Sequence, residues 1–304
     1  MNKKISTRTA YGEALAEIGS DPRIFVLDAD LQCCTRTEQF GALYPERSRN
    51  VGIAEANMVG IAAGMAACGK IVFVNSFAMF TAGRAFEQIR NSLAYPHLNV
   101  KVIGTHAGVS VGKDGATHQC LEDLAAMRSI PGMVVLSPCD ANETRLMTKA
   151  MAADDGPFFM RLGLLDVEEC TNFVPGYRFE WGKATELYEG TDVTIIATGL
   201  MVQESLKARE LLAQEGISAA VLDMHTIKPL DREAVIKAAE KTGCIVTAEE
   251  ANILGGLGGP VPVLRVGVKD IFGRSGDPYA LLERYELTAK DVAAAARRAV
   301  AMKK

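Results

Sequence analysis

The chain has 304 residues, 48% of them hydrophobic, and a net charge of -4, which together predict an ordinary globular protein of about two domains. Lysine and arginine are scattered, which argues against a protein that binds nucleic acid or anionic membranes. No apolar run reaches the ~18 residues of a membrane-spanning helix, and no secretory signal begins the chain, so we expect a cytoplasmic protein. The seven cysteines lack a C-x-x-C pair, which predicts free thiols and no metal site.

The first half of the chain alternates short β-branched runs with longer segments rich in alanine and leucine. We expect buried strands at 23–30, 70–77, 100–108, 132–138 and 157–163, and helices at 8–19, 55–68, 82–94, 120–130 and 140–154. This alternation is typical of a doubly wound parallel sheet, and it predicts an α/β domain over residues 1–165.

A second, smaller α/β domain is expected over residues 183–304, after a turn-rich linker at 166–182. Its expected strands are 192–199, 217–231 and 244–250, and its expected helices are 203–216 and 232–243. A further strand is expected at 261–267, only ten residues after the preceding one. A parallel crossover normally takes a dozen or more residues. Either the last strand is not parallel to the one before it, or a helical segment is missing from this chain.

The glycine-rich stretches 255–260 and 108–115 lack the spacing of nucleotide-binding loops. The second stretch lies between two histidines, His106 and His118, in a loop that leaves a predicted strand and enters a predicted helix. Ligands of open α/β sheets bind outside the carboxyl ends of strands, so this loop is a candidate ligand site, with Asp114 between the two imidazoles. It is also consistent with an ordinary surface loop.

Glu55 is a carboxylate in the otherwise apolar stretch "NVGIAEANMVGIAAGMAACG". One interpretation is a first-turn residue of the helix at 55–68, stabilised by the helix dipole. The other is a functional acid, because apolar neighbours would raise the pKa of Glu55 and suit it to exchange a proton with a ring nitrogen.

Several motifs together resemble the carboxyl-terminal half of transketolase, a thiamine-diphosphate enzyme. They are "NVGIAEANMVGIAAGMA", "NSFAMF" and "GTHAGVSVGKDGATHQCLEDLAAMRSIPGMVVLSPCDANET", and the likeness extends from "STRTAYGEAL" to "VGVKDIFGRSGDPYALLERYELTAKDV". The resemblance implies a pyrimidine-binding domain followed by a transketolase carboxyl-terminal domain. It also implies transfer of a two-carbon ketol unit from a ketose donor to an aldose acceptor.

The resemblance implies cofactor contacts at three positions. Glu55 matches the glutamate that hydrogen-bonds N1′ of the cofactor's aminopyrimidine, and Phe77 and Phe80 match aromatic residues around that ring. The chemistry would be that of the thiamine ylid, acting as nucleophile and electron sink.

The resemblance also implies substrate contacts. His106 and His118 match histidines near the donor's C1 and C2 oxygens, and Asp114 matches a carboxylate that contacts a sugar hydroxyl. Arg8 and Arg161 match arginines at the mouth of the site that bind the sugar's terminal phosphate, a role suited to a guanidinium.

The chain departs from the family pattern in three places. The "GDG" motif and downstream asparagine that hold Mg²⁺ and the diphosphate are not found in a suitable setting, so we expect an obligate partner, the amino-terminal-half subunit of a split transketolase, and a heterotetramer. Cys34 replaces a serine that helps bind the acceptor's phosphate, and a thiol is a weak hydrogen-bonding group, so an unusual sugar terminus is a second expectation. The helix that relatives have after "GGLGG" is missing, which affects docking rather than chemistry.

Other members of the superfamily remain as alternatives. Deoxyxylulose-phosphate synthase usually lacks the histidine that corresponds to His106, and the β subunits of 2-oxoacid dehydrogenases have a different loop, so transketolase is preferred. A non-catalytic paralogue is the alternative from another class, and the joint presence of Glu55, His106, Asp114 and His118 argues against it.

Overall fold

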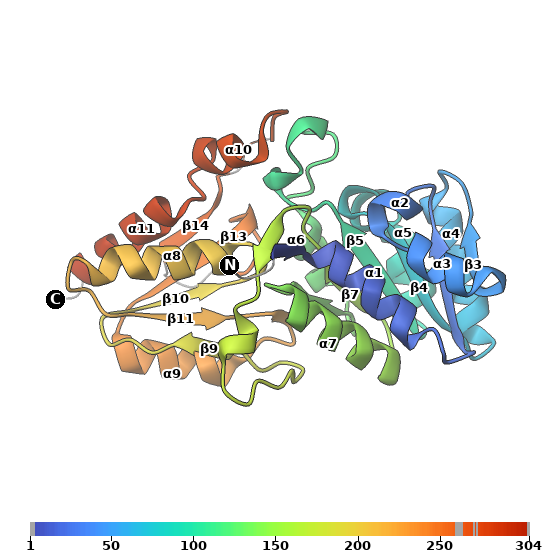
Figure 1. The fold of residues 1–304 in the computed structure, drawn as a ribbon, viewed down its shortest axis with the longest axis horizontal. Helices are drawn as coiled ribbons and strands as arrows, with labels where there is room; N and C mark the ends of the chain where they lie inside the picture. The colour runs from blue at the N-terminus through green and yellow to red at the C-terminus, as the bar shows by residue number, and fades with distance from the viewer. Residues whose placement is uncertain (1–3, 259–263, 270, 272, 303–304) are drawn as a thin grey trace.

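The computed structural model describes residues 4–258, 264–269, 271 and 273–302. Figure 1 shows an elongated molecule with two lobes, the amino-terminal half of the chain in one and the carboxyl-terminal half in the other. Both lobes are α/β, as the sequence predicts. Within the described residues, no helix is both long and apolar enough to span a membrane.

The first lobe is built on a mainly parallel sheet, in which only β12 runs antiparallel to its neighbour, β6. In spatial order its strands are β12 (Thr226–Lys228), β6 (Val134–Leu136), β7 (Phe158–Arg161), β5 (Val100–Thr105), β4 (Ile71–Phe77), β2 (Ile24–Asp28) and β3 (Ser48–Asn50). The central strands β4 and β5 are buried along their whole length, which explains why they read as continuous apolar runs.

Helices cover both faces of this sheet. One face packs against α1 (Thr7–Ile18), α3 (Glu38–Leu43) and α7 (Ala141–Ala153). The other face packs against α4 (Glu55–Ala67), two π-helical turns η2 (Met79–Arg84) and η3 (Ile89–Ala94), and α6 (Asp123–Ser129). Shorter helical pieces are α2 (Gln32–Thr35), η1 (Pro45–Arg47), α5 (Phe86–Gln88) and η4 (Val109–Asp114). The sheet is therefore doubly wound, as predicted.

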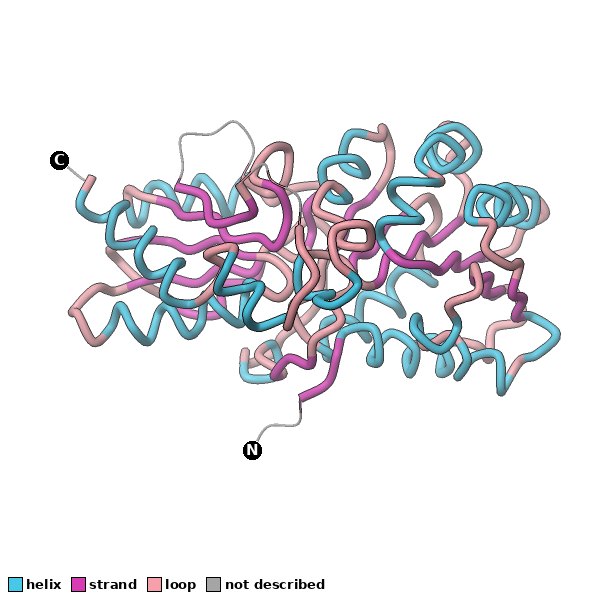
Figure 2. Tube along the Cα trace, turned by 90° about the horizontal axis from the view of Figure 1, so that it is seen from above, coloured by secondary structure: helices cyan, strands magenta, loops and turns pink. Residues whose placement is uncertain are grey.

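The second lobe has its own sheet, with strand order β14 (Leu264–Val268), β13 (Ile245–Asn252), β10 (Val193–Ala197), β11 (Ala219–Asp223) and β9 (Thr185–Tyr188). One face packs against α8 (Met201–Ala213), α10 (Pro278–Arg284) and α11 (Ala289–Ala301), and α9 (Arg232–Thr242) lies on the opposite side, as Figures 1 and 2 show.

Two expectations about the second lobe are corrected. The segment 217–231 is not one strand: β11 lies in the second sheet and β12 joins the first, because the chain crosses between the lobes at 224–225. The last strand, β14, is parallel to β13, so the antiparallel alternative is wrong. The described residues 253–258 between these strands form turns rather than a helix, and residues 259–263 lie outside the described residues.

The expected linker at 166–182 is not a free spacer. Its first residues form β8 (Asp166–Glu168), which pairs antiparallel with β1 (Lys4–Ser6), and the turn η5 (Thr171–Phe173) follows. Further along, Trp181 packs on Phe158 and Phe179 packs on His225, with ring centroids 5.1 and 4.9 Å apart. These contacts hold the two lobes together along this segment.

Candidate active site

The carboxyl ends of β2, β4 and β5 meet at one edge of the first sheet. Phe77, the last residue of β4, is paired in register with Thr105, the last residue of β5. His106 therefore leaves the sheet beside Phe77. Because ligands in open α/β sheets bind outside this edge, the candidate residues of three separate segments converge where a ligand is expected.

Glu55 is the first residue of α4, and it is only 1% exposed. It is a first-turn carboxylate, as the first interpretation has it, and it is also buried, as the second requires; its role as a functional acid stays a prediction. Its surroundings are less apolar than expected: Nη1 of Arg84 donates to the two carboxylate oxygens at 2.9 and 2.8 Å. The Arg84 side chain is 51% exposed, so this counter-ion reaches Glu55 from the solvent side.

Four aromatic rings form a cluster beside this ion pair. Phe77 and Phe80 stack with centroids 5.9 Å apart, and the imidazole of His106 lies 4.0 Å from the Phe77 ring. The His118 ring meets Phe80 edge-on at 5.3 Å. The Arg84 guanidinium lies over Phe80 at 4.6 Å, so the ion pair and the rings form one continuous site.

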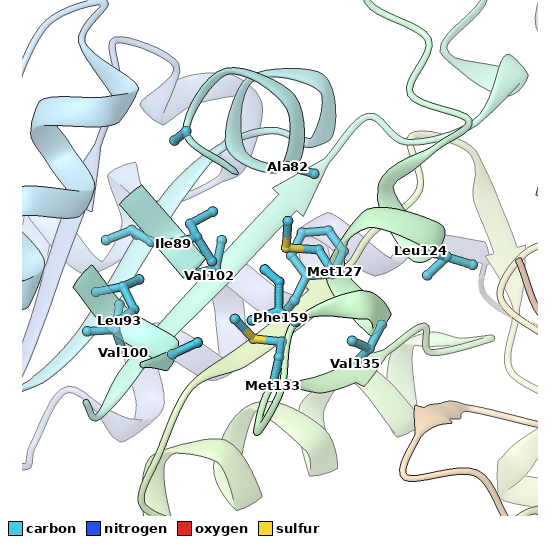
Figure 3. Close-up of a cluster of buried hydrophobic side chains, with 14 of the residues drawn as sticks. Ala82, Ile89, Leu93, Val100, Val102, Leu124, Met127, Met133, Val135 and Phe159 are labelled. Carbon is cyan, nitrogen blue, oxygen red and sulfur yellow. The ribbon is translucent and has the colours of Figure 1, made fainter. Parts of the chain in front are cut away.

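Phe80 and Arg84 both lie on the π-helical turn η2, whereas the sequence predicts an ordinary helix that begins only at residue 82. Single π turns inside helices occur frequently at functional sites. Figure 3 shows how the segment is anchored: Ala82 of η2 and Ile89 of η3 point into the buried apolar cluster, which also contains Phe159 of β7. The core thus fixes the backbone from which Phe80 and Arg84 project.

The second lobe supports the loop that bears His106 and His118. The backbone N–H of Ser110 donates to Oε1 of Glu250, a buried residue of β13, at 2.6 Å. Gly108 has φ of 84°, and a Cβ there would lie 2.3 Å from the Glu250 carboxyl carbon, so this position requires glycine. Figure 1 shows the loop beside α10. The second lobe therefore positions the histidines.

His106 is neutral at physiological pH. Burial is the main cause, and the charges of Arg8, His118 and Arg36 add to it, so that the pKa of His106 is lowered to about 3. Its Nδ1 is 3.0 Å from Oγ1 of Thr105. A neutral imidazole held in this way has one nitrogen left that can donate or accept at a substrate hydroxyl.

Replacing His106 with asparagine is expected to reduce the acid sensitivity of folding. The pKa of His106 is lower in the folded chain than in the unfolded chain, so the unfolded state binds the proton first and the native state loses stability as pH falls through 6.5 toward 3. Between pH 7.5 and 5 this group alone should cost about 2 kcal/mol. Asparagine tolerates the φ of 55° at this position. Urea midpoints at both pH values should fall less in His106→Asn than in the wild type. An equal fall would contradict the buried neutral imidazole.

Arg8 and Arg36 form a cationic cluster near the site. Nη1 of Arg8 donates to the backbone oxygen of Cys34 at 2.7 Å. Burial, followed by the charge of Arg36, lowers the pKa of Arg8, which shows that the two guanidiniums share one region. In the described part of the chain, Nε of each is buried without a hydrogen-bond partner. Asp114 lies on the exposed side and is close enough to influence the pKa of the Cys34 thiol, which burial raises. Nη1 of Arg36 lies 3.8 Å from Oε1 of Glu38, an exposed carboxylate. Two neighbouring guanidiniums are suited to binding an anion.

Arg161 differs from the expectation that it lies at the mouth of the site. It is 5% exposed, its Nε donates to Oδ2 of Asp123 at 2.8 Å, and Nη2 donates to the backbone oxygen of Glu250 at 2.7 Å. A buried arginine needs such partners, because an unpaired buried charge is costly. In this structure Arg161 connects the two lobes, and Arg36 is the arginine found near Arg8.

The residues present fit the pyrimidine half of thiamine diphosphate. A buried carboxylate and two stacked phenyl rings match the needs of a flat aminopyrimidine with a basic ring nitrogen. Among the described residues, the groups that could hold a metal ion lie elsewhere, around Cys139.

Three residues of the site were missed in the sequence. Arg84 follows Phe80 by one turn in the stretch "FTAGRAF", Arg36 lies in "CCTRTEQF", and Glu250 ends "VTAEE". The spacing of Arg84 from Phe80 was a usable signal. Glu250 and Arg36 depend on long-range packing, and no local pattern marks them.

Comparisons with known proteins identify the family of this chain. The family model "Transketolase, pyrimidine binding domain" matches residues 3–166, and "Transketolase, C-terminal domain" matches residues 182–292. The chain belongs to the transketolase family. Transketolases depend on thiamine diphosphate, and this chain corresponds to their carboxyl-terminal half, as the resemblance predicted.

Several relatives are separate subunits of about this length. A putative transketolase C-terminal section of Methanocaldococcus jannaschii is 46% identical over 298 residues, covering 94% of this chain and 93% of that protein. A 6-deoxy-6-sulfo-D-fructose transketolase subunit of a Clostridium species is 45% identical, covering 95% of this chain and 92% of its own length. A solved structure described as a split gene transketolase, inactive beta4 tetramer, is 50% identical with a TM-score of 0.90, and the match covers 99% of this chain and 100% of that chain. The chain covers only 49% of human transketolase, at 38% identity.

Proposed function

We propose that this chain is the pyrimidine-binding subunit of a thiamine-diphosphate-dependent transketolase that moves a two-carbon ketol unit from a ketose to an aldose. The observation on which this proposal rests is the buried carboxylate of Glu55 beside the stacked rings of Phe77 and Phe80, at the same sheet edge as His106 and His118.

Each of these residues has a role that follows from its position. Glu55 holds a proton at the pyrimidine nitrogen, because a buried carboxylate binds a nitrogen donor strongly. Phe77 and Phe80 exclude water around the ring. His106, being neutral, and His118 donate to or accept from the sugar oxygens next to the bond that forms or breaks. When bound, the cofactor supplies the carbanion-stabilising chemistry.

Binding of the cofactor's pyrimidine at Glu55 requires Arg84 to release or share the Glu55 carboxylate. Its half-exposed side chain can move into solvent without disturbing the core, since within the described residues its polar and ring partners are Glu55 and Phe80. We infer that Arg84 satisfies the buried charge of Glu55 in the free chain.

The proposal includes an obligate partner, the amino-terminal-half subunit of a split transketolase, that holds the diphosphate and Mg²⁺. It is supported by the match of this chain to half of the human enzyme. It is also supported by the relative described as an inactive tetramer of one subunit type. A heterotetramer remains the assembly that we propose.

The substrate class follows from Arg8 and Arg36, which suit a sugar with an anionic terminus. Among the relatives named for their substrates, one acts on a sulfo sugar and another, 39% identical, is an apulose-4-phosphate transketolase subunit. Both names include an anionic group. We propose that a phosphate or sulfonate occupies the Arg8–Arg36 cluster.

The test is donor choice by the enzyme reconstituted with the amino-terminal-half subunit, thiamine diphosphate and Mg²⁺. Hydroxypyruvate with an aldose should yield a ketose lengthened by two carbons, and pyruvate should give no product. Turnover of pyruvate would favour the alternatives, a synthase-like or dehydrogenase-β-like subunit. Assembly without turnover of either donor would favour a non-catalytic paralogue.

A further inference from the structure

A second group of chemically reactive side chains lies at the junction of the two lobes, away from Glu55 and the histidines. We call it the junction cluster: Cys139, Glu143, Cys170 and Asp223. Cys139 follows β6, Glu143 is in the first turn of α7, Cys170 precedes η5, and Asp223 ends β11. Three separate segments therefore contribute: one bears both Cys139 and Glu143, and the others bear Cys170 and Asp223.

The donor atoms of this cluster are close together. The two sulfur atoms are 3.6 Å apart, and the donor atoms of Cys139, Glu143 and Asp223 all lie within 4.8 Å of one another. The donor atoms of Cys139, Cys170 and the neighbouring Asp140 form a second such group. Because Cys139 belongs to both groups, it is the centre of the cluster.

Asp223 is buried beside Cys139 and Glu143, and among the described residues no cationic side chain is found next to it. It is 0% exposed, and in the described part of the chain neither of its carboxylate oxygens has a hydrogen-bond partner. Burying a charged group without a compensating partner is unfavourable. The partners found for Glu143 are the backbone N–H of Cys139 at 2.8 Å and the hydroxyl of Tyr177 at 2.5 Å, and neither is a cation. A metal ion would compensate both carboxylates.

Asp140 fixes the geometry of the cluster before any metal binds. Its Oδ2 accepts from the backbone N–H groups of Cys170 and Thr171 at 2.8 and 2.7 Å, and its Oδ1 accepts from that of Glu143 at 2.8 Å. These bonds fix the segment before η5 against the first turn of α7. Asp140 is therefore a positioning residue, and its acceptor capacity is used for that purpose.

The 3.6 Å between the sulfur atoms is the contact distance of two reduced thiols, and it is compatible with two ligands of one metal ion. Two thiolates on one tetrahedral zinc, each about 2.3 Å from it, lie about 3.8 Å apart. A disulfide needs about 2.05 Å. Two sulfur and two carboxylate donors in four-coordinate geometry are a donor set that zinc accepts.

One member of the cluster, Cys170, reaches the surface, and the other three are fully buried. Cys170 is partly exposed and lines a cleft of about 350 Å³ between the β8–η5 segment and α8. Acidic side chains outnumber basic ones in the lining of this cleft: Asp166, Glu168, Glu169, Glu204 and Glu210 against Lys4, Lys207 and Arg209.

We propose that Cys139, Cys170, Glu143 and Asp223 bind one zinc ion, which ties the segment between the lobes to α7 and to the end of β11. On binding, each thiol releases its proton to solvent and no electron is transferred. The site is structural, because the four donors fill the coordination sphere. No sequence motif marks it, since its ligands are spread from residue 139 to residue 223.

The test uses the full chain, incubated with Zn²⁺ under reducing conditions, passed through gel filtration and measured for bound metal. We expect about one zinc per chain, and with Co²⁺ as the probe a cobalt–thiolate absorption band. Cys170→Ser and Asp223→Asn should each weaken zinc binding at least about 10-fold and remove the rise in melting temperature that Zn²⁺ produces. Cys68→Ser, at an exposed thiol on the first lobe, is the matched control and should bind as the wild type does.

Zinc at background level in the folded wild type would overturn the proposal. So would zinc that is retained equally by Cys170→Ser and Asp223→Asn, or a cobalt complex without the thiolate band. Circular dichroism of each variant before metal is added shows that a loss of binding does not come from unfolding.

Discussion

Glutamine at position 55 is expected to reduce ketol transfer by at least about 10²–10⁴-fold, the range of a lost general acid–base group. Glu55→Gln keeps the size of the side chain and replaces the acceptor oxygen with an amide that cannot hold a proton in the same way. The first-turn position on α4 and the burial of the residue are unchanged. The measurement is kcat of the reconstituted enzyme with hydroxypyruvate and an aldose.

The control for this variant is Glu17→Gln, at an exposed position on α1 whose partner is Lys149 on the surface. It should retain full activity. Light scattering of the Glu55→Gln complex should show normal assembly. Arg84 loses its ion-pair partner in this variant, but its side chain is half-exposed and water can solvate it. Normal turnover by assembled Glu55→Gln would show that this carboxylate has no part in the reaction.

Removing a guanidinium at position 8 or 36 is expected to lower kcat/KM for an acceptor with a phosphate terminus by about 10- to 100-fold. A hydrogen bond to a charged group contributes roughly 1.5–3 kcal/mol, which corresponds to that range. Arg8→Gln and Arg36→Asn are the variants of choice, since Arg36 has φ of 67° and asparagine adopts this conformation readily. The loss should appear mainly in KM.

An acceptor without an anionic group provides the internal control, and its kcat/KM should be unchanged in both variants. Arg23→Gln, at an exposed arginine paired with Asp21, controls for net charge. In the same assay Cys34→Ser tests the thiol: a higher kcat/KM for the phosphorylated acceptor would show that Cys34 disfavours phosphate. Equal losses for charged and uncharged acceptors in Arg8→Gln and Arg36→Asn would contradict anion binding by this cluster.

The fold could be predicted from the sequence to a large extent because its central strands are buried on both faces. Continuous apolar runs such as those of β4 and β5 are strong local signals. The prediction fails where tertiary packing decides. One β-rich run at 217–231 is divided between two sheets, and the short edge strands β1, β3, β8 and β9 have too few residues for a pattern. The π-helical turns around Phe80 have the composition of an ordinary helix.

The candidate site could be predicted where the residues follow a strand or begin a helix. The structure brings Phe77, Phe80, His106 and His118 together, and Arg84 joins them to Glu55. Arg161 shows the limit, since its pairing with Asp123 depends on how two distant segments pack. The junction cluster shows the same limit, because its members come from three segments that are distant in the sequence.

One titration tests the central claim most directly. This chain is added stepwise to the purified amino-terminal-half subunit in the presence of thiamine diphosphate and Mg²⁺. Ketol transfer is recorded at each ratio. We expect no activity from either subunit alone, a rise with each addition, and saturation at equal numbers of the two chains. The contrary result is a complex that forms but remains inactive at every ratio, with hydroxypyruvate as donor and both charged and uncharged aldoses as acceptors. It would contradict the assignment of this chain as a catalytic subunit.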